Sequence, residues 1–262
     1  MQRQFVANAF ENGPFTGNPA AVVPLKRWPD DALLQAIAAQ NNLSETAFFV
    51  DGEPAELRWF TPTEEIDLCG HATLATAHVL FAELEDPRER IEFETQSGRL
   101  AVTRADEGYT LDFPEALSTP APELAEQVFA AAGVDDGEVL TAGGRVHLVL
   151  DSASAVRRLT PDQGAVTDLP RGDLFVSAPG DSGYDLATRV FAPGVGIPED
   201  PATGAAHCAF TPYWCARLGR ETVTSWQVSS RGGFFVCRWR REEGRVDLTG
   251  SCRTFLSGEV RV

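Results

Sequence analysis

The chain has 262 residues, which is long enough for one large domain or for two small ones. Hydrophobic residues make up 43% and charged residues 23%, as in soluble globular proteins, and 38 acidic against 22 basic residues give a formal net charge of −16. Because such a surface repels phosphate backbones and anionic lipid, we expect neither a nucleic acid nor a membrane as a partner.

The cysteine content and the chain start indicate a cytoplasmic protein. Five cysteines in a chain of this length, none of them in a CxxC motif, do not form a disulfide scaffold. The first residues lack the apolar stretch of a secretion signal, and no run of apolar residues reaches the length of a membrane span.

In chain order, the first half predicts strands at 4–9, 20–25, 46–50 and 56–60, with a helix at 30–41. In that helix Leu33, Leu34 and Ile37 are expected on one face. A run that is apolar nearly all round then begins at Gly70 and continues to Leu84. Since a helix without a polar face is buried on all sides, we expect this one inside a sheet.

The second half repeats this order. The segment RWFTP at 58–62 is matched by RVFAP at 189–193, and each precedes a loop and an apolar helix, the second one at 204–218. Each half then continues with a hairpin, which is TQSGRLAV at 95–102 in the first and SSRGGFFV at 229–236 in the second. Each ends in a strand, at 109–113 in the first half and at 245–248 in the second. We interpret the pattern as a duplication. The alternative is two unrelated α+β segments that share turn chemistry.

The duplication predicts an α+β fold of two similar halves, each a mixed sheet wrapped around a central helix. The Pro- and Ala-rich stretch at 114–122 is the best boundary. We therefore expect an N-terminal half of residues 1–113, completed by the C-terminal strand 252–262, and a C-terminal half of residues 114–251.

The starts of the two apolar helices are candidate anion sites. Gly70 and Gly204 open them, and the small residues Ala72 and Ala205 let a ligand approach the backbone amides. Aligned peptide dipoles add about half a positive charge at each helix end, so two such ends facing one another would bind a carboxylate. Alternatively, the glycines only begin tightly buried helices.

Four short motifs together resemble the PhzF family, named for a phenazine-biosynthesis isomerase. They are FTGNPA at 15–20, LSETA at 43–47, CGHAT at 69–73 and EDPATG at 199–204, and the glycine pair 232–233 also fits. The resemblance spans nearly the whole chain. It implies the duplicated fold of diaminopimelate epimerase, with an active site in the cleft between the halves. It also implies proton-transfer chemistry without a cofactor, and a homodimer.

The resemblance assigns candidate roles residue by residue. Epimerases of this fold use two cysteines, and the matching positions here are Gly70 and Asp200, while Cys69 lies one place early. The PhzF branch uses a glutamate instead, and Glu45 matches it. His71 and Asp200 match its other catalytic groups. The residues expected to bind substrate are Ser44, Asn18, Gly70, Ala72, Gly204 and Ala205.

The residues suit that chemistry. Moving a proton between two carbons needs one acid/base that takes the proton and returns it elsewhere, and a buried carboxylate such as Glu45 can do so. The alternative for Glu45 is a surface charge at a strand start. His71, at a helix N-terminus, should tend toward the neutral form, its alternative role being a helix cap. Asp200 could hold a substrate amine or assist protonation, or serve as the N-cap of the second apolar helix.

We therefore expect a cofactor-independent isomerase that shifts a proton on a small carboxylate-bearing metabolite, a cyclic dihydroanthranilate-like acid being one candidate. One alternative is an amino-acid epimerase or racemase of the same fold with Cys69 as a base. Another is a non-catalytic ligand-binding or interaction protein. We expect no metal, because His71 and His78 share a helix face but lack an evident third ligand.

Overall fold

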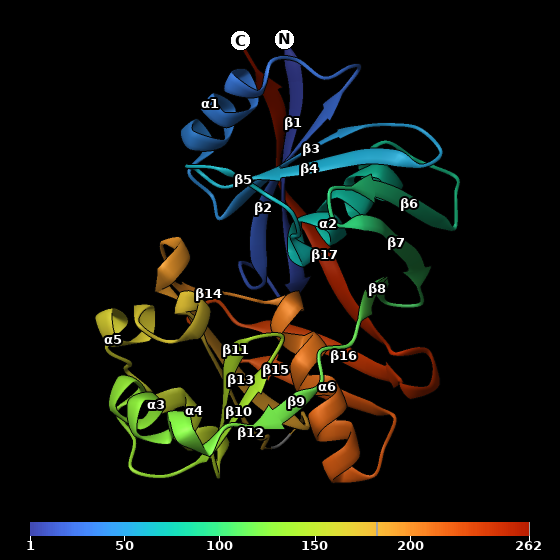
Figure 1. Cartoon of the computed structure of the whole chain (residues 1–262). Coiled ribbons are helices and arrows are strands. Elements are labelled where there is room, and N and C mark those ends of the chain that lie inside the picture. Colours follow the sequence, from blue (N-terminus) through green and yellow to red (C-terminus); the bar gives the residue numbers. More distant parts are fainter. Residues whose placement is uncertain (182, 262) are drawn as a thin grey trace. The chain divides into compact units, whose positions relative to one another are not determined.

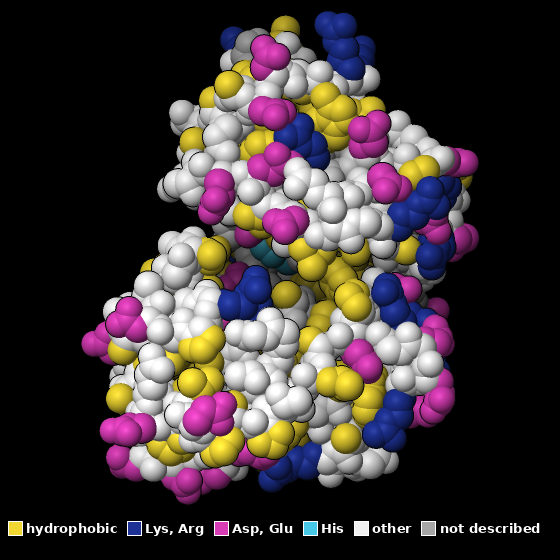
Figure 2. Space-filling model, in the orientation of Figure 1, with side chains coloured by type: hydrophobic (Ala, Val, Ile, Leu, Met, Phe, Trp, Pro, Cys, Tyr) yellow, Lys and Arg dark blue, Asp and Glu magenta, His cyan; other side chains and the backbone are white. Residues whose placement is uncertain are grey.

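The computed structural model describes residues 1–181 and 183–261 (Figure 1). The chain forms two compact units, one of residues 1–112 with 249–262 and one of residues 113–248. Acidic side chains are dispersed over the visible face of both units, with arginines between them (Figure 2). Within the described part of the chain, no helix combines the length and the apolar character that crossing a membrane requires.

The first unit consists of a mixed sheet and two helices. Its strands are β1 (Gln2–Glu11), β2 (Asn18–Leu25), β3 (Glu45–Val50), β4 (Ala55–Phe60), β5 (Glu65–Ile66), β6 (Arg90–Thr95), β7 (Gly98–Ala105) and β8 (Gly108–Pro114). Its helices are α1 (Asp31–Asn41) and α2 (Gly70–His78), and α2 continues as a π-helical turn, η1 (Val79–Glu83). The long strand β17 (Arg245–Val260) begins in the second unit and completes the first.

The strands of the first unit close on themselves around α2. Pairing runs from β17 to β1, β2, β3, β4, β6, β7 and β8, and β8 pairs with β17 again. Figure 1 shows α2 among these strands. All nine residues of α2 are buried, and because most of them are Gly, Ala or Thr, the helix is thin enough to be enclosed. The expectation of a central buried helix is confirmed here.

Helix α1 covers the outer face of this sheet. Leu34, Ile37 and Ala38 pack against Phe48 and Phe60. Leu33, which the sequence placed on the same face, is instead 37% exposed. The buried stripe runs along the i, i+3 and i+4 positions that begin at Leu34.

The second unit repeats this plan. Its strands are β9 (Ser118–Pro120), β10 (Glu138–Ala142), β11 (Arg145–Val149), β12 (Leu174–Pro179), β13 (Leu186–Ala192), β14 (Ile197–Asp200), β15 (Thr222–Gln227) and β16 (Gly233–Arg240). Its α-helices are α3 (Ala125–Ala132), α4 (Ala153–Arg158), α5 (Gln163–Thr167) and α6 (Gly204–Leu218). Short 3₁₀ turns are η2 (Pro122–Leu124), η3 (Pro170–Gly172), η4 (Pro193–Val195) and η5 (Arg241–Glu243).

Strand pairing proves the duplication. In the first unit β1–β2 is antiparallel, β2–β3 parallel, β3–β4 antiparallel and β4–β6 parallel. In the second, β10–β11, β11–β12, β12–β13 and β13–β15 follow the same sequence of directions. The short strands β5 and β14 each add to the matching strand, β4 or β13, just before the central helix. The α+β fold with two similar halves is therefore confirmed.

An arginine–glutamate pair recurs at the same place in both units. Arg58 of β4 donates two hydrogen bonds to Glu65 of β5, both of 2.7 Å. Arg189 of β13 donates two to Glu199 of β14, of 2.7 and 2.9 Å. A bidentate arginine contact fixes both the position and the orientation of the carboxylate. The pairs therefore anchor the short strands that lead into α2 and α6.

The first central helix is shorter than the sequence indicates. The predicted helix at 70–84 remains α-helical only to His78, and the chain then widens into the π-helical turn of Val79–Glu83. The second helix has the predicted bounds, with Pro212 inside it. Both helices still supply the buried centre of their unit, as the apolar pattern predicts.

Candidate functional site

Three predicted site residues of the first unit meet in one buried cluster. Glu45 is the first residue of β3, His71 lies in the first turn of α2, and Asn18 is the first residue of β2. Cys69, directly before α2, joins them. Between 0 and 7% of each residue is exposed, so water scarcely screens the charges of this cluster.

His71 lies at the centre of the cluster. Its Nε2 lies 3.0 Å from Oε2 of Glu45, an ion-pair distance. Its Nδ1 lies 3.3 Å from Nδ2 of Asn18 and 3.5 Å from Sγ of Cys69. Neither Nε2 of His71 nor Oε2 of Glu45 has a well-aligned hydrogen-bond partner among the described residues. The imidazole therefore bridges the carboxylate on one side and two polar groups on the other.

The pKa of His71 departs from the sequence expectation. Burial lowers it, but the Coulombic and hydrogen-bonding interactions with Cys69 and Glu45 outweigh burial and raise the pKa of His71 well above its ordinary 6.5. The helix N-terminus alone favours neutral imidazole, which is the form expected from the sequence. The direction of the shift contradicts that expectation, because Cys69 and Glu45 both act on the ring at short range, whereas the positive partial charge of the helix is spread over its end.

A raised pKa has the opposite effect on the charge of Cys69. Burial and the neighbouring Glu45 raise the pKa of its thiol to about 11. The thiol is therefore protonated at neutral pH and is a poor base there.

The remaining predicted residues of the first unit lie beside this cluster in the chain. Ser44 is half-buried and directly precedes Glu45. Gly70 and Ala72 are buried in the first turn of α2 and flank His71. Helix geometry leaves the amides of this turn without intrahelical acceptors. A glycine shapes the approach to Asn18, since a Cβ on Gly17 would lie 2.5 Å from the Ala9 carbonyl oxygen.

In the second unit, Asp200 ends β14 and its carboxylate accepts a hydrogen bond from the Thr203 hydroxyl. The N-cap of α6 is Thr203 and not Asp200, so the alternative of Asp200 as the N-cap was wrong. Gly204 is buried and Ala205 is exposed at the start of α6. The small exposed residue leaves this helix end accessible within its own unit.

Sequence reasoning missed Gln227, a fully buried residue at the end of β15. Its Nε2 donates to the Asp200 carbonyl at 2.6 Å and to the Thr203 hydroxyl at 3.1 Å, and its Oε1 accepts from the Thr203 amide at 2.8 Å. These bonds hold both ends of the loop between β14 and α6. A single polar residue at a strand end carries no local signal of this role.

His207, in the second turn of α6, is a structural histidine. Its Nδ1 contacts the Thr203 carbonyl oxygen at 2.8 Å, and its Nε2 contacts the Ser225 hydroxyl at 2.9 Å. Burial lowers its pKa to about 4. The ring is therefore neutral at pH 7, with Nδ1 donating and Nε2 accepting.

His78 does not extend the cluster toward a metal site with His71. Its Nδ1 lies 3.1 Å from the Tyr109 hydroxyl and its Nε2 lies 2.9 Å from the Thr254 hydroxyl. Since both ring nitrogens have partners, the pairing of His71 with His78 that the helix spacing suggests does not occur.

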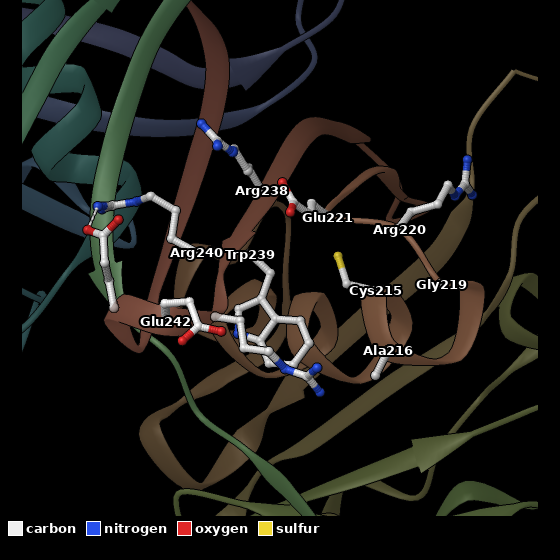
Figure 3. A pocket seen from close by; sticks show the side chains of 11 residues that line it. Cys215, Ala216, Gly219, Arg220, Glu221, Arg238, Trp239, Arg240 and Glu242 are labelled. Atoms are coloured by element: carbon white, nitrogen blue, oxygen red, sulfur yellow. Dashed lines mark hydrogen bonds and ion pairs between the residues drawn. The ribbon is translucent and has the colours of Figure 1, made fainter.

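A surface pocket of about 490 Å³ lies in the second unit, around the basic run that ends β16 (Figure 3). Arg238 is exposed, but Arg240 pairs with Glu243 and Asp247, and Arg220 with Asp185. Carboxylates thus neutralise much of this positive charge. None of the predicted site residues lines the pocket.

Comparison with known proteins agrees with the motifs. The family model described as "Phenazine biosynthesis-like protein" (PhzC-PhzF) matches residues 7–258. An "uncharacterized isomerase" of Pseudomonas aeruginosa is 44% identical, with all of both chains covered. A crystal structure of a PhzF-family protein from Enterococcus faecalis is also 44% identical, with a TM-score of 0.94 and 100% and 99% of the two chains covered.

More distant structures share the fold alone. A probable proline racemase from Agrobacterium radiobacter is 13% identical, with a TM-score of 0.62 over 100% of this chain and 93% of the other. The duplicated sheets, the motifs and the full-length matches lead to one conclusion: this chain is a member of the phenazine biosynthesis-like PhzC-PhzF family.

Proposed function

We propose that this protein is a cofactor-independent isomerase that moves a proton between two carbons of a small carboxylate-bearing metabolite, with Glu45 as the acid/base. The observation that carries the proposal is the buried Glu45–His71 pair at 3.0 Å in a chain of this family. Related proteins named isomerases support the reaction class.

The chemistry follows from this pair. The Glu45 carboxylate takes a proton from one substrate carbon; the electrons of the broken C–H bond form a double bond to the next carbon, and those of the existing double bond move to the far carbon. The carboxylic acid, after exchange of its proton with solvent, protonates that far carbon, so that no net proton is consumed. His71, whose pKa is raised well above 6.5, lies 3.0 Å from the carboxylate and is placed to donate to it or to the substrate.

Backbone amides are the proposed carboxylate binders. In α2 these belong to Gly70 and His71, and in α6 to Gly204 and Ala205. In a chain of net charge −16 the overall field opposes an anionic substrate, so local donors must supply the attraction. We propose that Asp200, at the end of β14, assists protonation or holds a substrate amine.

Solvent exchange tests the proposal. With a dihydro-hydroxyanthranilate or a related acid in deuterated water, deuterium should enter carbon, and Glu45→Gln should abolish the incorporation. Glu11→Gln is a matched control, because Glu11 is a buried glutamate of the same unit that pairs with Arg253.

One observation favours a second candidate, an epimerase that uses Cys69 as one base. Sγ of Cys69 lies 3.5 Å from Nδ1 of His71, so the imidazole could accept the thiol proton. The raised pKa of this thiol opposes the role. A Cys69→Ala variant that still moves deuterium into substrate carbon at a comparable rate would eliminate this candidate.

A further inference from the structure

Three metal-binding side chains come together at the start of α2. One donor atom each of Glu45, Cys69 and His71 lies within 4.8 Å of the others, and all three residues are buried. Within residues 1–181 and 183–261, this is the one place where three such side chains gather.

The contact between Glu45 and His71 lacks hydrogen-bond alignment. Oε2 of Glu45 and Nε2 of His71 are buried and, among the described residues, have no aligned hydrogen-bond partner although they lie 3.0 Å apart. No directed hydrogen bond therefore fixes the carboxylate, which leaves it able to serve as a ligand of a bound cation.

The spacing on the other side of the ring suits a tetrahedral ion. Sulfur bound at about 2.3 Å and nitrogen bound at about 2.0 Å on one zinc ion lie roughly 3.5 Å apart. Sγ of Cys69 and Nδ1 of His71 are 3.5 Å apart. One ligand atom of each of the three residues lies within 4.8 Å of the others, so the Glu45 carboxylate is the third ligand of the group. A thiolate, an imidazole and a carboxylate together favour zinc over magnesium or calcium.

We propose that Glu45, Cys69 and His71 form an inhibitory zinc site. The inhibition rests on the proposed function, because the bound ion occupies the carboxylate that acts as acid/base. The binding reaction conserves charge, because one Zn²⁺ replaces two protons, the thiol proton of Cys69 and the proton on His71. Before and after the exchange, the three side chains with their bound protons or ion carry no net charge.

Other histidines of the chain do not offer such a site. Both ring nitrogens of His207 and of His78 contact polar groups of the protein. His147 likewise contacts the hydroxyls of Ser118 and Ser177. The inference therefore concerns one site and one bound ion per chain.

A cobalt titration tests the site without reference to activity. Co²⁺ added to the metal-free protein should produce a thiolate-to-cobalt charge-transfer band in the near ultraviolet that saturates at one equivalent. Zn²⁺ should displace the cobalt and remove the band. Cys69→Ala and Cys69→Ser should lose the band and weaken binding at least about a hundredfold, since even outer partners of a metal site change affinity by about 10–100-fold.

Cys237→Ala is the matched control, because Cys237 is also buried but lies in the second unit. This variant should keep both the band and the stoichiometry. A wild-type protein without the band, or a band that survives in both Cys69 variants, would overturn the inference. Near-ultraviolet circular dichroism of each variant establishes that its fold is retained.

Inhibition is measured separately. Zn²⁺ should stop deuterium exchange in the wild type and in Cys237→Ala, and a chelator should restore it. Cys69→Ala, compared with its own metal-free rate, should be at least about a hundredfold less sensitive. Cobalt binding without any exchange activity would refute the proposed isomerase and leave the metal site intact. Exchange activity without cobalt binding would refute the metal site alone.

Discussion

Nε2 of His71 lies 3.0 Å from Oε2 of Glu45, at a place where both side chains are less than one-tenth exposed. The contact changes the protonation of the imidazole. Cys69 and the carboxylate of Glu45 together raise the pKa of the imidazole well above 6.5. The protonation of His71 should therefore influence stability across the pH range in which its folded and unfolded forms differ.

The pH dependence of His71→Gln follows from this pair. Because the pKa of His71 is raised on folding, its contribution to stability is fully present below its unfolded value of 6.5 and is lost as the pH rises through the folded pKa. The free energy of unfolding of wild type relative to His71→Gln should therefore fall as the pH rises above 6.5. Urea unfolding across pH 6–10, with a chelator present, measures this difference. A difference that grew with pH would contradict the raised pKa.

Gln227→Leu should destabilise the loop that carries Asp200. The change leaves the Thr203 amide and the Asp200 carbonyl without their partner, at a cost of about 1–3 kcal/mol for each buried group. We expect a loss of about 2–4 kcal/mol in urea unfolding and a lower kcat. Gln127→Leu is the control, since Gln127 is an exposed residue whose side chain makes one bond of 3.2 Å, to the Asp168 carbonyl. Equal stability of the two variants would refute the positioning role of Gln227.

Gly233→Ala tests the contact between the late hairpin and the same loop. A Cβ on Gly233 would lie 2.5 Å from Cβ of Ala202, so β16 or the loop must shift. Overpacking of this kind costs about 1–3 kcal/mol. We expect that loss in thermal or urea unfolding, with reduced substrate affinity. Gly258→Ala, whose added Cβ meets only a side-chain atom at 3.9 Å, should unfold like the wild type.

Asp173, at the start of β12, should make stability fall between pH 4 and pH 6. Burial raises its pKa from 3.8 to about 6, although Arg145 pairs with it. The folded state then holds a proton that the unfolded chain has released, so stability decreases as the pH rises through this window. Asp173→Asn should flatten the pH profile of unfolding there. An unchanged slope would show that burial does not raise the pKa of this carboxyl.

Much of the fold could be predicted because it depends on local patterns. The apolar helix at 204–218 and the repeated arginine motifs are visible in short windows of sequence, and the strands predicted in the first half lie within β1 to β4, each of which begins one or two residues earlier. The π-helical end of the first central helix could not be predicted, because the apolar pattern of the sequence continues unchanged past His78. The exposure of Leu33 also could not be predicted, since the elements that pack against a helix decide which edge of its apolar face is buried.

The candidate site, too, could be predicted from the sequence only in part. Motifs pointed to Glu45 and His71, and the structure places them in contact. The contact of Asn18 with His71 joins residues 53 positions apart, and the three bonds of Gln227 join residues 24 and 27 positions away. Such contacts depend on strand pairing, which no short window contains. The raised pKa of His71 escaped prediction for the same reason, because Glu45 arrives from another strand.

The most direct test of the account is deuterium incorporation by Glu45→Gln. Glutamine keeps the size of glutamate but cannot take a proton from carbon, so removing an essential acid/base should reduce exchange by at least about 10²–10⁴-fold. Glu11→Gln should stay near the wild-type rate. Mass spectrometry of the substrate recovered from deuterated water, after a chelator has removed metal, gives both rates. No incorporation by Glu45→Gln beside full incorporation by the control is the predicted result, and wild-type incorporation by Glu45→Gln would contradict the central role of Glu45.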